Sequence, residues 1–308
     1  MANRIANPIY DSVFKFMMED ERIARTLLSA LLQKKVVKVE MRPHEYANTQ
    51  QERISIFRID FGAYILEDDG SEHLVLVELQ KTWRPTETLR FRRYLGIQYE
   101  NEHNVAVETG EPLPIVSIYI LGHKVDDLKE PVVYVRRRYL DYDSNEITEG
   151  VPSPFVERLT HDSIIVQIPY LTGSTRNHLE ALLTVFDQSY VSEETKQMLT
   201  VGDRNKNQDE EVQYIFNRLA YAAANPDVRH MMDIEDEILG ELENLDTTIA
   251  KQKVQLQQKD EQLSRKDEQL SQKDEQLSQK DEQLSQKDEQ LSKQAEEIRR
   301  LKELLNQK

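Results

Sequence analysis

Two acidic residues lie in short apolar runs of the kind that form buried strands. Asp60 is in the run 56–66 (IFRIDFGAYIL) and Glu78 is in the run 73–79 (HLVLVEL). Both runs are rich in β-branched and aromatic residues, and the turn sequence between them, which contains Gly70, predicts a β-hairpin. A loop of three or five residues, with Gly70 left-handed, pairs residue i with residue 138 − i. Asp60 then lies opposite Glu78 on one face of the hairpin.

Paired carboxylates at this spacing suit a metal ion. Their Cβ atoms would lie roughly 5 Å apart, and the two charges repel each other unless a cation lies between them. Oxygen ligands favour Mg²⁺ or Mn²⁺. Because side chains alternate along a strand, Gln80 shares the face of Glu78 and Lys81 points the other way. The pattern predicts a metal site formed by Asp60 and Glu78, with Gln80 beside it.

Two other arrangements are compatible with the same residues. A two-residue loop would place Asp60 opposite Leu79 and send the two carboxylates to opposite faces. Arg58, two residues from Asp60 on the same face, could neutralise it in an ordinary buried ion pair.

The order of an Asp, a hairpin and Glu-x-Lys resembles the site pattern of the PD-(D/E)XK nuclease superfamily. The variant Asp60…Glu78-Leu79-Gln80-Lys81 is similar to its recombination-promoting nuclease and transposase branch, as are the segments 7–15 (NPIYDSVFK) and 94–99 (YLGIQY). Two positions depart from the pattern. Ile59 stands where the name motif has Pro, and Gln80 stands where most active members have Lys, the cation thought to orient the attacking water.

The resemblance implies a restriction-endonuclease-like α/β core, which is a mixed sheet flanked by helices, over residues 1–190. It implies cleavage of DNA with Mg²⁺ or Mn²⁺, in which Asp60 and Glu78 hold the metal and Gln80 orients water. In the wider superfamily the first helix can supply a further acid, and Asp11 or Glu19 could do so here.

The elements around the hairpin are expected to be helices. The spacing of apolar residues over 11–32 predicts an amphipathic helix, or one broken near 19–21, for which Asp11 is also a candidate N-cap. A further helix is expected from Pro85 to about His103. Arg90 and Arg93 share one face of it and could contact the DNA backbone, although a charged helix face is often only solvated.

The remaining elements complete the expected order. Strands are predicted over 35–41, 114–121, 132–135 and 163–168, and helices over 175–186 and 193–224, with a break at Asn225-Pro226. We therefore expect an acidic helical subdomain over 191–240.

The last part of the chain, 241–308, is a repeat of KDEQLSQ. One apolar residue recurs in every heptad, at position a, while lysine occupies position d from Lys259 to Lys287. Leu242, Leu245 and Ile249 upstream, and Ile298, Leu301 and Leu305 downstream, keep the same phase. We predict a coiled coil through which the chain forms homo-oligomers; the alternative is a solitary solvated helix.

Composition limits the other possibilities. The 308 residues include no cysteine and carry a formal charge of −16, of which residues 207–248 contribute −9. DNA-binding proteins are usually basic, so the acidity of the chain counts against a DNA partner, but its concentration in 207–248 weakens that objection. No apolar run approaches the ~20 residues of a membrane span and no signal peptide is evident, so we expect a cytoplasmic protein with no membrane contact. Zinc and P-loop motifs are absent from the sequence. An inactive nuclease-fold scaffold that oligomerises through its coiled coil, and cleavage of RNA, both stay open.

Overall fold

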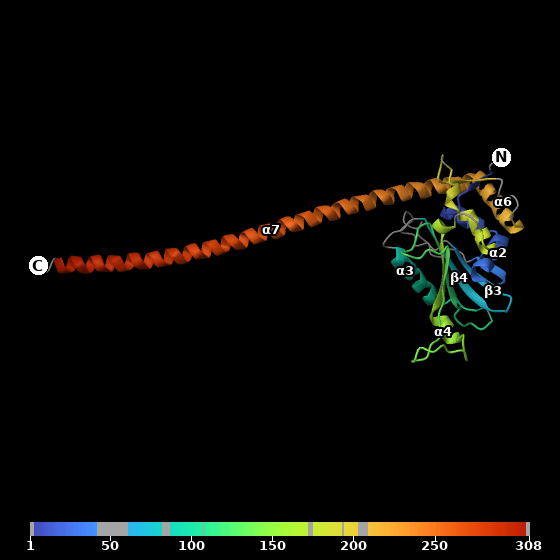
Figure 1. The fold of residues 1–308 in the computed structure, drawn as a ribbon, viewed down its shortest axis with the longest axis horizontal. Coiled ribbons are helices and arrows are strands. Elements are labelled where there is room, and N and C mark those ends of the chain that lie inside the picture. The colour runs from blue at the N-terminus through green and yellow to red at the C-terminus, as the bar shows by residue number, and fades with distance from the viewer. Residues whose placement is uncertain are drawn as a thin grey trace. The chain divides into compact units, whose positions relative to one another are not determined.

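A six-stranded mixed sheet with helices on both faces forms the core of the compact unit Met1–Glu237 (Figure 1). The computed structural model describes residues 3–41, 61–81, 87–106, 108–171, 175–192, 194–202 and 209–305. The predicted α/β class with a mixed sheet is confirmed. The strand order is β2-β3-β4-β5-β7-β6. The strands are β2 (Val36–Met41), β3 (Phe61–Glu67), β4 (Glu72–Gln80), β5 (Ile115–Leu121), β6 (Val132–Val135) and β7 (His161–Gln167).

Strands β3 and β4 form the predicted hairpin in the predicted register. Phe61 pairs with Val77 and Leu66 with Glu72, so paired residues sum to 138 wherever the structure describes both partners. Gly70 takes a φ of 84° in the loop, as the odd-length turn requires. The register of a two-residue loop is therefore excluded. Asp60 and Arg58 lie outside the described residues.

Strand β4 is buried on both faces from Leu74 to Gln80. It pairs in parallel with β5, and β5 pairs in parallel with β7, an arrangement that normally requires cover on both sides of the sheet. Val75, Val77 and Leu79 enter the main core, whereas Leu74 and Leu76 join a second, smaller core. Helix α3 (Glu87–Glu100) covers the second face through Leu95.

Helices α1 (Asp11–Met18) and α2 (Glu21–Leu32) cover the main core. The helical region 11–32 is therefore interrupted near 19–21, which was one of the two predicted alternatives. Asp20 is the N-cap of α2: its Oδ1 accepts hydrogen bonds from the backbone N–H groups of Arg22 (3.0 Å) and Ile23 (3.3 Å). Its Oδ2 accepts a hydrogen bond from the Tyr214 hydroxyl at 2.8 Å.

The prediction that Asp11 caps α1 is wrong. Asp11 is the first helical residue, and the N-cap, Tyr10, makes no side-chain cap bond. The free N–H groups of Asp11 and Ser12 instead donate to the Glu235 carboxylate, each at 2.9 Å. A residue more than 200 positions away in the sequence thus supplies the cap, because the packing of the last helix brings it there.

The segment 193–224 is not helical throughout. Residues Met198–Val201 form β8, which pairs with β1 (Asn3–Ala6) in a separate two-stranded sheet. The prediction of a helix is wrong there and correct for α6 (Glu210–Ala224), whose Val212, Ile215 and Leu219 are buried in the main core. This part belongs to a compact unit that runs from Met1 to Glu237. Short helices α4 (Pro154–Leu159) and α5 (His178–Leu183) complete that unit.

Helix α7 (Pro226–Leu305) begins directly after the predicted break at Asn225-Pro226 and continues for 80 residues. The residues from Ile238 onward form a second unit. In the part of the chain that the structure describes, no helix is long and apolar enough to cross a membrane.

Substituting Asp20 by alanine should destabilise the compact unit by about 1–2 kcal/mol, because two N–H groups of α2 lose their acceptor. Asp20→Asn is the matched control, since asparagine caps helices about as well as aspartate. Urea denaturation followed by circular dichroism measures both. Equal stability of Asp20→Ala and the native chain would contradict the capping role.

Candidate functional site

Glu78 and Gln80 lie side by side on the α3 face of β4, as predicted. Their exposed fractions are only 5% and 7%. They pair in register with Tyr119 and Leu121 of the parallel strand β5. A buried carboxylate is costly unless hydrogen bonds or a cation compensate its charge, so its place near the end of an otherwise apolar strand marks this spot as a candidate site.

The walls around Glu78 come from two other elements. Phe91 and Tyr94 of α3, and Ser117 and Tyr119 of β5, line a recess of about 20 Å³ beside Glu78. That volume holds one water-sized occupant. The Phe91 and Tyr119 rings lie 5.0 Å apart between centroids. Burial raises the pKa of the Tyr119 hydroxyl, and the charge of Glu78 acts in the same direction. The phenol thus stays a neutral hydroxyl group at neutral pH.

The donor set at this position fits a hard divalent cation. Glu78 offers carboxylate oxygens and Gln80 an amide oxygen, which are the ligand types that Mg²⁺ and Mn²⁺ prefer. No histidine or cysteine is among the residues that line the recess in the described part of the chain. Asp60, the second predicted carboxylate, lies outside the described residues.

Lys81 points to the other side of the strand, as expected from the alternation. Its ammonium group lies 3.3 Å from the Asp236 carboxylate and 3.6 Å from the centre of the Tyr10 ring. The Tyr10 hydroxyl donates to the same carboxylate at 2.8 Å. Burial lowers the pKa of Lys81, and Asp236 opposes that shift. Lys81 therefore fastens the end of β4 to α7 and does not face the recess.

Gly122 fixes the same end of β4 from the neighbouring strand. Its N–H donates to the Gln80 carbonyl at 2.7 Å. A Cβ atom at this position would lie 2.4 Å from the Lys81 carbonyl oxygen and 2.8 Å from Cδ1 of Ile9. Only glycine allows this approach, so Gly122 helps to position the backbone that carries Gln80.

The other predicted site residues lie elsewhere. Asp11 forms an ion pair with Lys15 at 2.6 Å, and Glu19 is exposed, 3.9 Å from Arg218. Asp11 begins α1 and Glu19 is its C-cap residue, and α1 packs on the face of the sheet opposite Glu78. Arg93 is exposed on α3 and does not line the recess. The side chain of Arg90 lies outside the described residues.

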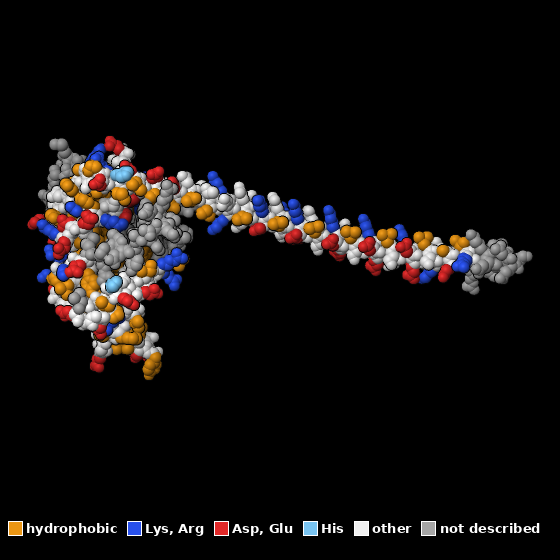
Figure 2. Space-filling model, turned by 180° about the vertical axis from the view of Figure 1, so that it is seen from behind, with side chains coloured by type: hydrophobic (Ala, Val, Ile, Leu, Met, Phe, Trp, Pro, Cys, Tyr) orange, Lys and Arg blue, Asp and Glu red, His pale blue; other side chains and the backbone are white. Residues whose placement is uncertain are grey.

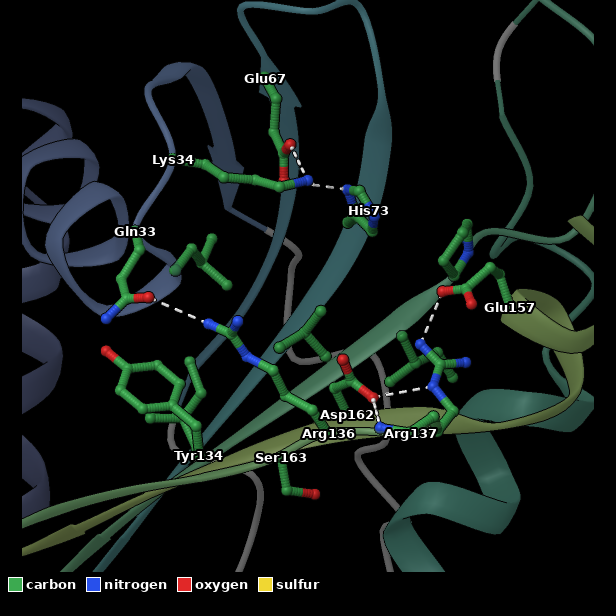
Figure 3. Close-up of a pocket in the computed structure, with 15 residues that line it drawn as sticks. Gln33, Lys34, Glu67, His73, Tyr134, Arg136, Arg137, Glu157, Asp162 and Ser163 are labelled. Carbon is green, nitrogen blue, oxygen red and sulfur yellow. Dashed lines mark hydrogen bonds and ion pairs between the residues drawn. The ribbon is translucent and has the colours of Figure 1, made fainter. Parts of the chain in front are cut away.

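A larger pocket, of about 360 Å³, opens where β4, β5 and β7 begin (Figure 3). The sequence did not indicate it, because its walls come from segments far apart in the chain. The charged side chains in its walls form ion pairs or hydrogen bonds with neighbouring side chains. Arg137 forms ion pairs with Asp162 at 2.8 Å and Glu157 at 2.6 Å, and Arg136 donates to the Gln33 side chain at 3.0 Å. The pocket therefore offers a less distinct chemistry than the Glu78 recess.

A buried acid and a histidine form one wall of this pocket. Figure 3 shows Lys34 and His73 on either side of Glu67. The distances to the Glu67 carboxylate are 2.6 Å from Lys34 and 3.3 Å from Nδ1 of His73. Burial lowers the pKa of His73 despite the attraction of Glu67, so the folded protein resists protonation of this ring.

Comparisons with models of known protein families, with curated proteins and with solved structures found no match to this chain.

Gly122→Ala should destabilise the compact unit by about 1–3 kcal/mol, as overpacking does, because the new methyl group meets backbone atoms of β4. Gly96→Ala is the control: it lies in α3, where an added Cβ meets nothing within 4 Å, and should be neutral or stabilising by up to about 1 kcal/mol. Urea denaturation compares the two. Equal effects of both substitutions would remove the case for a close approach at Gly122.

The stability of the protein should fall as the pH drops below the ordinary histidine pKa of about 6.5, in part because the unfolded chain takes up a proton that folded His73 resists. His73→Gln should make this fall shallower between pH 7.5 and pH 5. Thermal unfolding across that range measures the slope, with substitution of the exposed His230 by glutamine as the control for loss of any imidazole. Identical slopes for His73→Gln and the native chain would refute the account.

Proposed function

We propose that the protein is a divalent-metal-dependent endonuclease of the PD-(D/E)XK type, or a transposase of that branch, which hydrolyses phosphodiester bonds in DNA. The observation that supports this most directly is the register of the β3–β4 hairpin, with its sum of 138 up to the pair Phe61–Val77. In the proposal the register continues for one more pair. Asp60 then faces Glu78 on the side of the sheet where Gln80 is buried.

Each residue of the proposed site has a distinct role. Asp60 and Glu78 hold the metal, which would activate water and neutralise charge on the scissile phosphate. Gln80 orients the attacking water, since its amide can both donate and accept hydrogen bonds. It has no positive charge, so it stabilises developing negative charge less than a lysine does. Neutral Tyr119 offers a hydroxyl beside Glu78.

The DNA backbone would lie along α3 in this proposal. Arg92 and Arg93 are exposed on that helix, and Arg90 precedes them by less than one turn. Exposed arginines contact phosphates without reading sequence, so they would supply affinity that falls as salt rises. Much of the negative charge of the chain lies in 207–248 rather than near α3.

An inactive nuclease-fold scaffold is the second candidate, and one observation favours it. The position that most active members of the superfamily fill with a lysine holds Gln80, and the nearest lysine, Lys81, is engaged with Asp236 on the other side of β4. In that case binding through α7 would be the working part of the protein.

Nicking of supercoiled plasmid by the purified full chain with Mg²⁺ separates the two candidates. Asp60→Asn and Glu78→Gln keep side-chain shape and remove the charge. Each should lower the rate by more than about 100-fold, because mutation of residues that only contact metal ligands already lowers metal affinity or activity by about 10–100-fold. Glu72→Gln is the matched control, six positions earlier on the same face of β4, and should leave the rate unchanged. EDTA should abolish nicking.

Gln80→Lys should raise the rate, because it restores a cation beside the attacking water. Folded protein that cuts neither duplex DNA, single-stranded DNA nor RNA, with Mg²⁺ or Mn²⁺, would overturn the enzyme proposal in favour of the scaffold. Cleavage of RNA alone, lost in Glu78→Gln, would retain the metal site and replace the substrate.

A further inference from the structure

Helix α7 presents a continuous row of apolar side chains to solvent. The row runs from Ile249 to Ile298 at every seventh residue, and all residues of the row between these two isoleucines are leucine. These side chains are 50–61% exposed in the single chain. Figure 2 shows apolar side chains recurring along the helix, bordered by basic and acidic ones. A row of this length is unusual for a helix that remains alone in water.

The lysines at position d of the repeat have no acidic partner along their own helix. Every lysine at position d, from Lys259 to Lys287, has only glutamine or leucine three and four residues away in either direction. Solitary charged helices depend on acid–base pairs at this spacing. The five lysines have no acidic residue placed for such a pair, so the stretch from Lys259 to Lys287 has little of this support, and the ion pair of Lys293 with Glu289 (2.8 Å) lies beyond it. A partner helix that covers the leucines would supply stabilising contacts.

We propose that this partner is α7 of a second copy of the chain, packed antiparallel, with residue i opposite residue 543 − i. A second copy fits because the apolar residues at position a keep one heptad phase from Leu242 to Leu305 without interruption, so an identical helix offers an identical row. The proposal concerns α7 alone and does not depend on the nuclease function.

Charge favours the antiparallel orientation. In a parallel pair in register, each d lysine faces its own copy, which stacks five Lys–Lys layers inside the coiled coil. In the antiparallel pair a and d positions alternate across the seam, so Leu263 faces Lys280 and Leu256 faces Lys287. The aliphatic stem of each lysine then covers a leucine while its ammonium group reaches solvent. Leucine at position a also departs from the parallel-dimer preference for β-branched residues at a and leucine at d.

The two ends of the row fix the register. Position d is apolar only at Ile238 and Leu245 near one end and Leu301 at the other. A sum of 543 brings each of these opposite an apolar a residue, which gives six wholly apolar layers, for example Leu245 against Ile298. A shift by one heptad in either direction leaves four such layers. The repeats alone would tolerate any such shift, so the ends select one.

The absence of cysteine makes a clean cross-linking test possible with the full chain. Leu263→Cys and Lys280→Cys are made separately and oxidised alone and as an equimolar mixture. A disulfide needs Cα atoms within about 7 Å. Opposed residues in the proposed pair meet this limit, whereas like residues lie 17 positions, or about 25 Å, apart along the axis. We expect disulfide-linked dimers in the mixture and none in either protein alone.

The mixture of Leu256→Cys and Lys280→Cys is the register control. Its residues sum to 536 and lie about 10 Å apart along the axis, so no cross-link is expected. Cross-linked dimers in each single variant alone would show a parallel pair and overturn the proposal. So would cross-linking of the control mixture in place of the test mixture. A mass of 36.1 kDa by analytical ultracentrifugation at all concentrations, the mass of one chain, would also overturn it.

Discussion

The burial of β4 on both faces is the constraint on which the rest of the compact unit depends. Val75, Val77 and Leu79 anchor one face in the main core, so every even position of the strand must face α3. A slip of one residue would turn the Glu78 carboxylate toward that apolar core, where burying a charge is costly. The same packing that holds the sheet together therefore decides which side of it carries the polar pair, and the antiparallel return through β3 sets how far along the strand the pair lies.

The sequence was sufficient where short-range chemistry decides the outcome. The hairpin register is the one expected for an odd-length loop with Gly70 left-handed, and the break between α1 and α2, where Asp20 caps α2, is one of the two alternatives that the apolar spacing allowed. It was insufficient where distant segments meet. Strand β8 is only four residues long and exists because the N-terminal strand pairs with it, which no local pattern reveals. The predicted cap of α1 was wrong for the same reason, since Glu235 reaches the N-terminus of α1 only in the folded chain.

The candidate site also has a part that the sequence predicted and a part that it did not. Alternation along β4 was enough to place Glu78 and Gln80 together and to send Lys81 to the other side. The aromatic wall of the recess was not predictable, because Phe91 and Tyr119 meet through the packing of α3 on β5. Nor was the attachment of Lys81 to Asp236, which ties the end of β4 to the first turns of α7. The compact unit and the base of the long helix are thereby one structural body up to Glu237.

The repetition in α7 separates the length of the protein from its fold. One heptad extends a helix by about 10 Å and turns its apolar row by only about 20° relative to two full turns, so the row survives the addition or removal of a repeat. Such a change spans seven codons and leaves the reading frame intact. The length of α7 can therefore change in whole steps of one heptad, while the two ends of the apolar row and the sheet that carries Glu78 stay unchanged.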